Sequence, residues 1–122
     1  MSGFLGGTIM EWKQAQTIYV EAKEQSQGDE DALTLWQQLI EDGVFYARLR
    51  TDWKLADIQQ RMAMDETRTQ AHDAFIASCD ILARYLRTLD RDIGWRQDLG
   101  VDRKEIGDFA CYIHALLGIS AR

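Results

Sequence analysis

Apolar residues recur three and four positions apart along most of the chain, which is the spacing of one face of an α-helix. No segment shows the strict alternation of apolar and polar residues that is typical of a β-strand. The chain also contains no proline, the residue that breaks helices. The clearest run alternates steps of three and four, as a heptad does, and consists of His72, Phe75, Cys79, Leu82, Leu86, Leu89 and Ile93.

Capping signals predict where the first helices begin and end. Thr8 followed three residues later by Glu11 is the pattern of a capping box, and it predicts a first helix that runs to about residue 25. Gly28 suits the left-handed conformation that follows a helix. Asp29 is the predicted N-cap of the second helix.

The apolar stripe that follows keeps its phase for about thirty residues. One helix over residues 30–63 is therefore consistent with the pattern. Two helices that break near Gly43 or at residues 51–52 are equally consistent, because glycine costs about 1 kcal/mol inside a helix. The members of the stripe are Leu33, Trp36, Ile40, Val44, Ala47, Leu55, Ile58 and Met62.

The second half of the chain predicts two further helices. Asp65 is the predicted N-cap of the helix that carries the heptad-like run, and residues 94–100 are predicted to be a connection. Asp102 caps the last helix, which Gly118 ends. We expect an all-α fold in a single domain, an antiparallel bundle of four or five helices over residues 8–118. Residues 1–7 are expected to be a flexible N-terminal tail and residues 119–122 a C-terminal tail.

The four tryptophans are expected to pack in or against the hydrophobic core. Trp12 and Trp36 lie on apolar stripes and are predicted to be buried. Trp53 and Trp95 lie near predicted helix ends, where we expect them to be partly buried as lids of the bundle.

Charge and composition narrow the classes of partner. The 122 residues carry a net charge of −6, all of it in residues 1–46, because residues 47–122 contain twelve acidic and twelve basic residues. Nucleic acid and anionic membranes are thus disfavoured as partners of the first helices. The start of the chain lacks the basic and apolar regions of a signal peptide, and no apolar run reaches membrane-spanning length. A cytoplasmic location is expected, with two free thiols.

Catalytic and metal-binding patterns are weak. Neither histidine follows a Glu-x-x-His spacing, and no nucleophile lies in a recognisable turn. We therefore expect no catalytic residue, no metal and no cofactor, and a protein that is not an enzyme. A metal-dependent hydrolase of the all-α type is one alternative, because two acids share a helix face in each of two pairs, Glu21 with Glu24 and Glu105 with Asp108. A zinc site would need Cys79, Cys111, His114 and His72.

Three arginines follow at helical spacing near the end of the heptad-like run. Arg84, Arg87 and Arg91 are predicted to share one face, with Asp80 one turn before Arg84 as its expected partner. Because guanidinium groups pair with carboxylates and phosphates, this row is the candidate site for an anion or an acidic partner.

Two segments are similar to a helix-turn-helix, residues 55–72 and residues 99–109. A DNA-binding transcriptional regulator is therefore the main alternative, although the acidic charge disfavours it. The candidate DNA contacts are Arg68, Gln70, Arg103 and Lys104. The leading expectation is a small, non-enzymatic interaction or regulatory protein that self-associates or binds a protein partner.

Overall fold

The all-α prediction is confirmed by the computed structural model, which describes residues 11–120, with side chains through residue 118. The described residues form five helices and no strand. These are α2 (Trp12–Gln25), α3 (Glu30–Leu55), α4 (Ile58–Thr88), α5 (Gly94–Leu99) and α6 (Arg103–Ser120).

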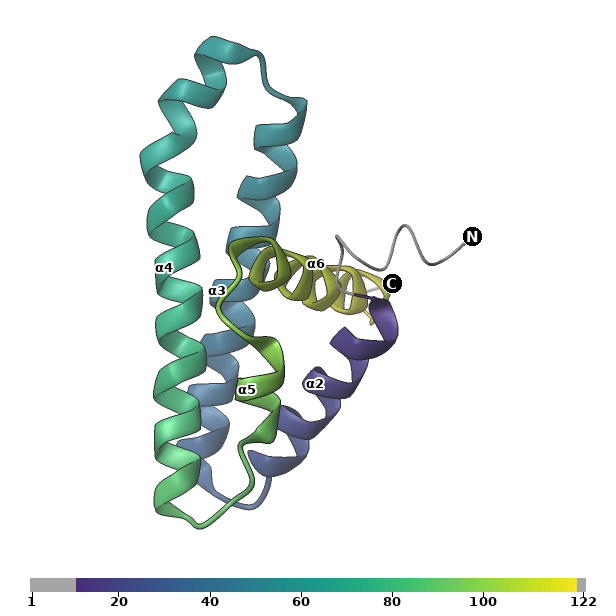
Figure 1. Ribbon diagram of the computed structural model, residues 1–122, viewed down its shortest axis with the longest axis vertical. Coiled ribbons are helices and arrows are strands. Elements are labelled where there is room, and N and C mark those ends of the chain that lie inside the picture. The colour runs from purple at the N-terminus through teal and green to yellow at the C-terminus, as the bar shows by residue number, and fades with distance from the viewer. Residues whose placement is uncertain (1–10, 121–122) are drawn as a thin grey trace.

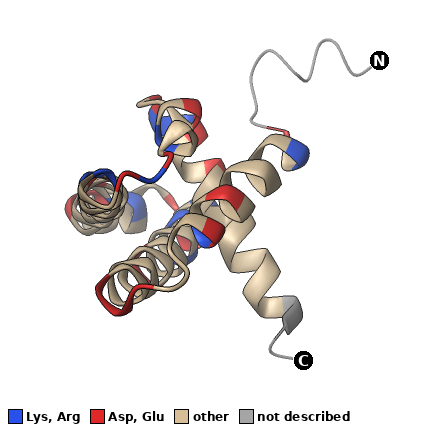
Figure 2. Cartoon of the chain, turned by 90° about the horizontal axis from the view of Figure 1, so that it is seen from below, with Lys and Arg blue, Asp and Glu red and all other residues tan. Residues whose placement is uncertain are grey.

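The antiparallel pair of α3 and α4 is the spine of the molecule (Figure 1). Helix α6 crosses this pair near its middle, and α2 and α5 lie beside its lower half. The upper end of the α3–α4 pair extends past α6 without a neighbouring helix. Seen from below, the charged residues of α6 are confined to its beginning (Figure 2), since none follows Asp108 up to Ser120.

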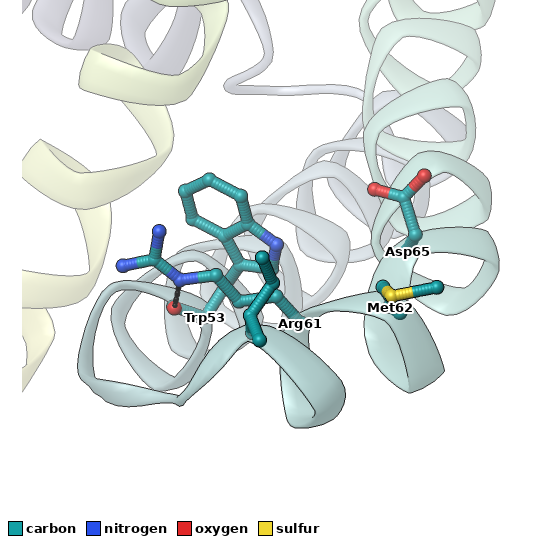
Figure 3. A pocket seen from close by; sticks show the side chains of 5 residues that line it. Trp53, Arg61, Met62 and Asp65 are labelled. Atoms are coloured by element: carbon teal, nitrogen blue, oxygen red, sulfur yellow. Dashed lines mark hydrogen bonds between the residues drawn. The ribbon is translucent and has the colours of Figure 1, made fainter.

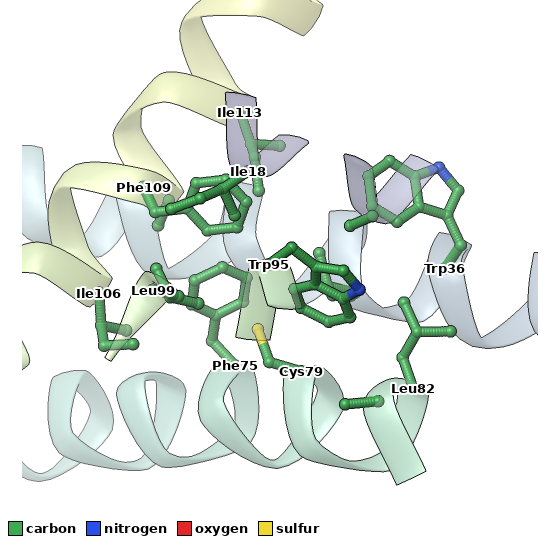
Figure 4. Close-up of a cluster of buried hydrophobic side chains, with 14 of the residues drawn as sticks. Ile18, Trp36, Phe75, Cys79, Leu82, Trp95, Leu99, Ile106, Phe109 and Ile113 are labelled. Carbon is green, nitrogen blue, oxygen red and sulfur yellow. The ribbon is translucent and has the colours of Figure 1, made fainter. Parts of the chain in front are cut away.

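Trp95 lies at the centre of the core. Its side chain is fully buried among Ile18 of α2, Phe75 and Cys79 of α4, and Phe109 of α6 (Figure 4). The prediction that residues 94–100 form a plain connection with a partly buried tryptophan is therefore wrong. One and a half turns of helix place the indole inside the bundle, where it removes a large apolar area from water.

Most of the predicted heptad-like run faces this core. The five members within α4 are buried, and Leu89 and Ile93 after its end pack against the core as half-buried residues. Trp36 is buried as expected. Trp12, which was predicted to be buried, is 60% exposed. It lies in the first turn of α2, and its ring contacts the ring of Tyr112.

Helix α3 passes through both predicted break points and ends at Leu55. Gly43 lies inside the helix because α3 approaches its neighbours closely there. A Cβ atom on Gly43 would lie 2.9 Å from Cε1 of Phe75 and 3.3 Å from Cδ1 of Ile113. The packing gained by this close approach outweighs the helix-propensity cost of about 1 kcal/mol.

Two of the three predicted N-caps that lie within the described residues are confirmed. The Asp29 carboxylate accepts from the Ala32 N–H, and Asp102 accepts from the Lys104 N–H. Helix α4 instead begins after Asp57, which forms a reciprocal capping box with Gln60. The predicted cap at Asp65 is wrong.

Two of the predicted helix boundaries lie near the ends of the chain. The predicted cap at Thr8 lies outside the described residues, and the residue before α2 is Glu11. Helix α6 continues through Gly118 to Ser120, so glycine does not end it. An open position in a helix tolerates glycine at the cost of its propensity alone.

Candidate interaction surface

The α3–α4 pair continues well beyond the hydrophobic core. The last buried residue of α3 is Ala47 and the first of α4 is Ala71. Residues 48–70, all of them described, include no buried residue. Arg50 still contacts the body through an ion pair of 3.1 Å with Asp108 of α6. We therefore call residues 51–70 the hairpin tip. Its α4 arm extends about 20 Å before Ala71 at 1.5 Å per residue.

Three large aliphatic side chains of the hairpin tip face solvent. Leu55 is 82% exposed, Ile58 76% and Met62 74%. The sequence placed all three on the core-facing stripe, and this expectation is wrong. Their helical phase does continue that of the core, but α6 and α2 do not reach this end of the hairpin (Figure 1).

Trp53 is held between two arginines of the opposite helix. The guanidinium carbons of Arg61 and Arg68 lie 4.2 Å and 4.1 Å from the centroid of its ring. Arg61 also donates to the carbonyl oxygens of Trp53, at 2.9 Å, and Lys54, at 3.1 Å (Figure 3). Arg61 thereby adds hydrogen bonds to two carbonyls in the last turn of α3, where carbonyls lack partners within the helix; the Trp53 carbonyl also accepts from the Ala56 N–H. The polar and aromatic groups hold the two arms together in place of an aliphatic core.

A shallow hollow of about 470 Å³ lies beside this stack, with Arg61 on one side and Asp65 on the other (Figure 3). Ile58, Met62 and Asp65 share its face, because they follow at i, i+4 and i+7 on α4. A second hollow, of about 390 Å³, lies on the other side of the hairpin tip. It is lined by Asp52, Leu55, Ala56, Gln60, Ala63 and Met64.

The hairpin tip is close to neutral and carries charges of both signs. It contains three basic and four acidic residues, for a net charge of −1, and the remaining 102 residues carry −5, which is the same charge per residue. Both signs occur around the exposed aliphatic residues. Such a surface can meet another mixed surface without large like-charge repulsion.

The predicted arginine row is not brought together. Arg84 and Arg87 are exposed on α4, but Arg91 lies after the helix has ended. Its guanidinium donates to the carbonyl oxygens of Gln25, at 2.7 Å, and Gln27, at 2.6 Å. Arg91 therefore closes the end of α2 and does not share a face with Arg84 and Arg87, as the spacing had predicted.

The expected partner of Arg84 is also different. Asp80 pairs with Arg96 of α5, with 2.6 Å between the carboxylate oxygen and Nε. A contact across helices replaces the predicted pair within one helix.

The segment 55–72 is not a helix-turn-helix, because α4 runs without interruption from Ile58 and contains Asp65. Arg68 stacks on Trp53, whereas Gln70 is exposed. The segment 99–109 runs from the last residue of α5 into α6, with a three-residue turn between the two helices. Its candidate contacts, Arg103 and Lys104, are exposed at the start of α6.

The residues that the sequence suggested as metal ligands do not form a cluster in the described part of the chain. Among the described residues, no group of three or more His, Cys, Asp or Glu side chains could hold a metal ion. Both cysteines are free thiols. Burial raises the pKa of the Cys79 thiol to about 12, which keeps it protonated and unreactive near neutral pH.

The sequence alone did not identify the stack around Trp53. A signal was present, since Arg61 and Arg68 are two helical turns apart on one face of α4. That signal is readable only once the chain is known to reverse at residues 56–57.

Within residues 11–120, no helix combines the length and apolar character needed to cross a membrane. Comparison with known proteins found no matching family model, no similar curated protein and no similar solved structure.

Proposed function

We propose that this protein is a small, non-enzymatic interaction module that self-associates through the hairpin tip. One observation carries the proposal: Leu55, Ile58 and Met62 are 74–82% exposed at the end of a projecting helix pair. Ile58 and Met62 line the same hollow and so form one exposed apolar patch, whereas Leu55 lines the second hollow. Single exposed aliphatic residues are ordinary on protein surfaces, but a contiguous apolar patch is typical of an interaction site.

The order of the hairpin tip supports the same function. Trp53 is fixed by Arg61 and Arg68, so its ring loses little freedom when a partner packs beside it. Tryptophan and arginine are the residues most often found at the energetic centre of an interface. Preorganisation of this kind lowers the entropy cost of binding. We also propose a reducing, cytoplasmic location, which agrees with two free thiols.

Sedimentation velocity across a range of protein concentrations tests this function. We expect a concentration-dependent dimer of the intact chain. Ile58→Glu places a carboxylate in the apolar patch and should raise the dimer dissociation constant at least about tenfold. Ile81→Glu is the matched control, because Ile81 is 43% exposed on the same helix but distant from the hairpin tip. A chain that stays monomeric, or equal effects of the two variants, would exclude the proposed surface.

We propose DNA binding as a second candidate function, at the α5–α6 turn. The favouring observation is the three-residue turn followed by exposed Arg103 and Lys104. The opposite face of α6 is committed to the core through Ile106 and Phe109, so few positions remain to contact bases. This function predicts salt-sensitive binding of duplex DNA that weakens in Arg103→Ala. Binding that is unchanged in that variant would remove the proposal.

A further inference from the structure

We infer that two copies of the chain pair side by side and antiparallel at their hairpin tips, forming a four-helix bundle with a two-fold axis near Met62. This inference rests on the proposed self-association and adds the pairing geometry and the residues that set it. Three properties of the hairpin tip point to a second copy as the occupant: its missing core, its charge and the placement of Arg61 and Asp65.

The hairpin tip has no buried core of its own. Residues 48–70, all of them described, form two helical arms with no buried side chain. Helix pairs in water are normally stabilised by burial of an apolar face, and a stable bundle of this kind has four helices. A second hairpin tip supplies two further helices of the same length. The exposed Ile58 and Met62 can then fill the partner's hollow and be covered by it.

Charge disfavours contacts between copies through the first helices. The whole net charge of −6 lies in residues 1–46, whereas the hairpin tip carries −1. Contacts between two copies through α2 or the first half of α3 therefore suffer like-charge repulsion. Antiparallel tips place the two bodies at opposite ends of the pair, farther apart than the screening length of about 8 Å at physiological salt.

The register follows from the hollow beside Trp53. Arg61 and Asp65 lie four residues apart on either side of Met62 in this hollow. A two-fold axis level with Ala63, one residue beyond Met62, brings Arg61 of each copy to Asp65 of the other, so two equivalent ion pairs form. Asp65 is available for this contact, because its side chain is 69% exposed and its contact to Arg68 is as long as 3.6 Å.

Charge reversal tests the register. Arg61→Glu or Asp65→Arg alone places two like-charge contacts in the symmetric dimer, and each should raise the dimer dissociation constant about tenfold. An equimolar mixture of the two variants should form a heterodimer with near wild-type affinity, since one original and one reversed pair are then both attractive. The double variant should recover the homodimer. Circular dichroism confirms that each variant retains its helix content, because Arg61 also supports Trp53.

Crosslinking tests the axis without altering charge. Met62→Cys in a Cys111→Ser background should yield a disulfide-linked dimer under mild oxidation, because the two sulfur atoms face each other near the axis. Cys79 is fully buried, so we expect it to form no crosslink. Ile81→Cys in the same background is the control and should remain uncrosslinked.

The outcomes separate the two proposals. Rescue in the mixture together with crosslinking at position 62 supports the antiparallel bundle. A dimer that Ile58→Glu dissociates, but that shows neither rescue nor crosslinking at position 62, refutes this geometry and leaves the interaction surface in place. A monomer at all concentrations refutes both.

Discussion

Arg61 covers the ring of Trp53 at 4.2 Å and at the same time donates to the carbonyl oxygens at the end of the helix that carries Trp53. One side chain thus fixes both the indole and the end of α3. Arginine can do this because its planar guanidinium stacks and donates from several nitrogens.

We predict that Arg61→Ala loosens the hairpin tip while the body stays folded. An exposed cation–π contact contributes about 0.5–1 kcal/mol, and a hydrogen bond from a charged group about 1.5–3 kcal/mol. Hydrogen exchange should therefore accelerate roughly tenfold or more at residues 51–62. Exchange in α6 should be unchanged, and Arg84→Ala, which removes an exposed arginine from the same helix, should leave both regions unchanged. Equal acceleration throughout the chain would contradict the separation of tip and body.

The close approach at Gly43 makes a second prediction. Gly43→Ala gains about 1 kcal/mol of helix propensity, but its Cβ meets the Phe75 ring at 2.9 Å. Overpacking of this kind costs about 1–3 kcal/mol, so we expect a net loss of stability in urea unfolding. Gly118→Ala is the matched control, because nothing lies within 4 Å of the added Cβ, and it should be neutral or stabilising.

Trp95 and Trp12 should differ sharply in their contribution to stability. Trp95→Ala empties the centre of the core and should lower the free energy of unfolding by about 3–5 kcal/mol. Trp12→Ala removes a ring that is 60% exposed, so its cost should stay near 1 kcal/mol or below. Denaturant titrations followed by circular dichroism measure both. A similar loss of unfolding free energy in the two variants would contradict the conclusion that burial of Trp95 in the core stabilises the fold.

The contact between Tyr85 and Asp29 predicts a pH dependence. The Tyr85 hydroxyl donates to the Asp29 carboxylate at 2.7 Å. This hydrogen bond raises the pKa of Tyr85 to about 12 and, with the Ala32 N–H, lowers the pKa of Asp29 below its ordinary value. Stabilisation from Asp29 is present above its ordinary pKa and is lost as pH falls through the lowered pKa. Stabilisation from Tyr85 is present below its ordinary pKa near 10 and is lost as pH rises toward 12.

Melting temperatures of the wild type and Tyr85→Phe measure this effect. The wild type should melt higher between about pH 5 and 9, and the difference should shrink below about pH 4 and above about pH 10. Thr88→Val, at a neighbouring exposed position of α4, should show no such profile. A difference that is constant across the whole range would contradict the assignment.

Sequence reasoning succeeded where local chemistry decides the structure. The heptad-like run of α4 was predicted from spacing alone, and Asp29 and Asp102 cap their helices because a short carboxylate before a helix meets unpaired N–H groups. It failed where tertiary packing decides. At Gly43 the sequence left one continuous helix and a break equally open, because the packing of Phe75 and Ile113 against Gly43 is not visible in the sequence.

The same reason explains why the candidate surface was missed. Leu55, Ile58 and Met62 keep the helical phase of the core, and phase does not tell where neighbouring helices stop. Arg91 also continued the spacing of Arg84 and Arg87, although Asp90, with a φ of 58°, lies outside the helix. A bend in the backbone is not visible in a periodic pattern.

The end of the core at Ala47 and Ala71 has a consequence for how this chain can diverge. Because both arms beyond these residues are regular helix joined at residues 56–57, seven residues can be added to or removed from each arm with only a small rotation of the helix faces. The reach of the molecule and the identity of its outermost side chains can therefore vary between descendants while the buried residues stay the same. Selection can then tune contacts at one end without passing through unfolded intermediates.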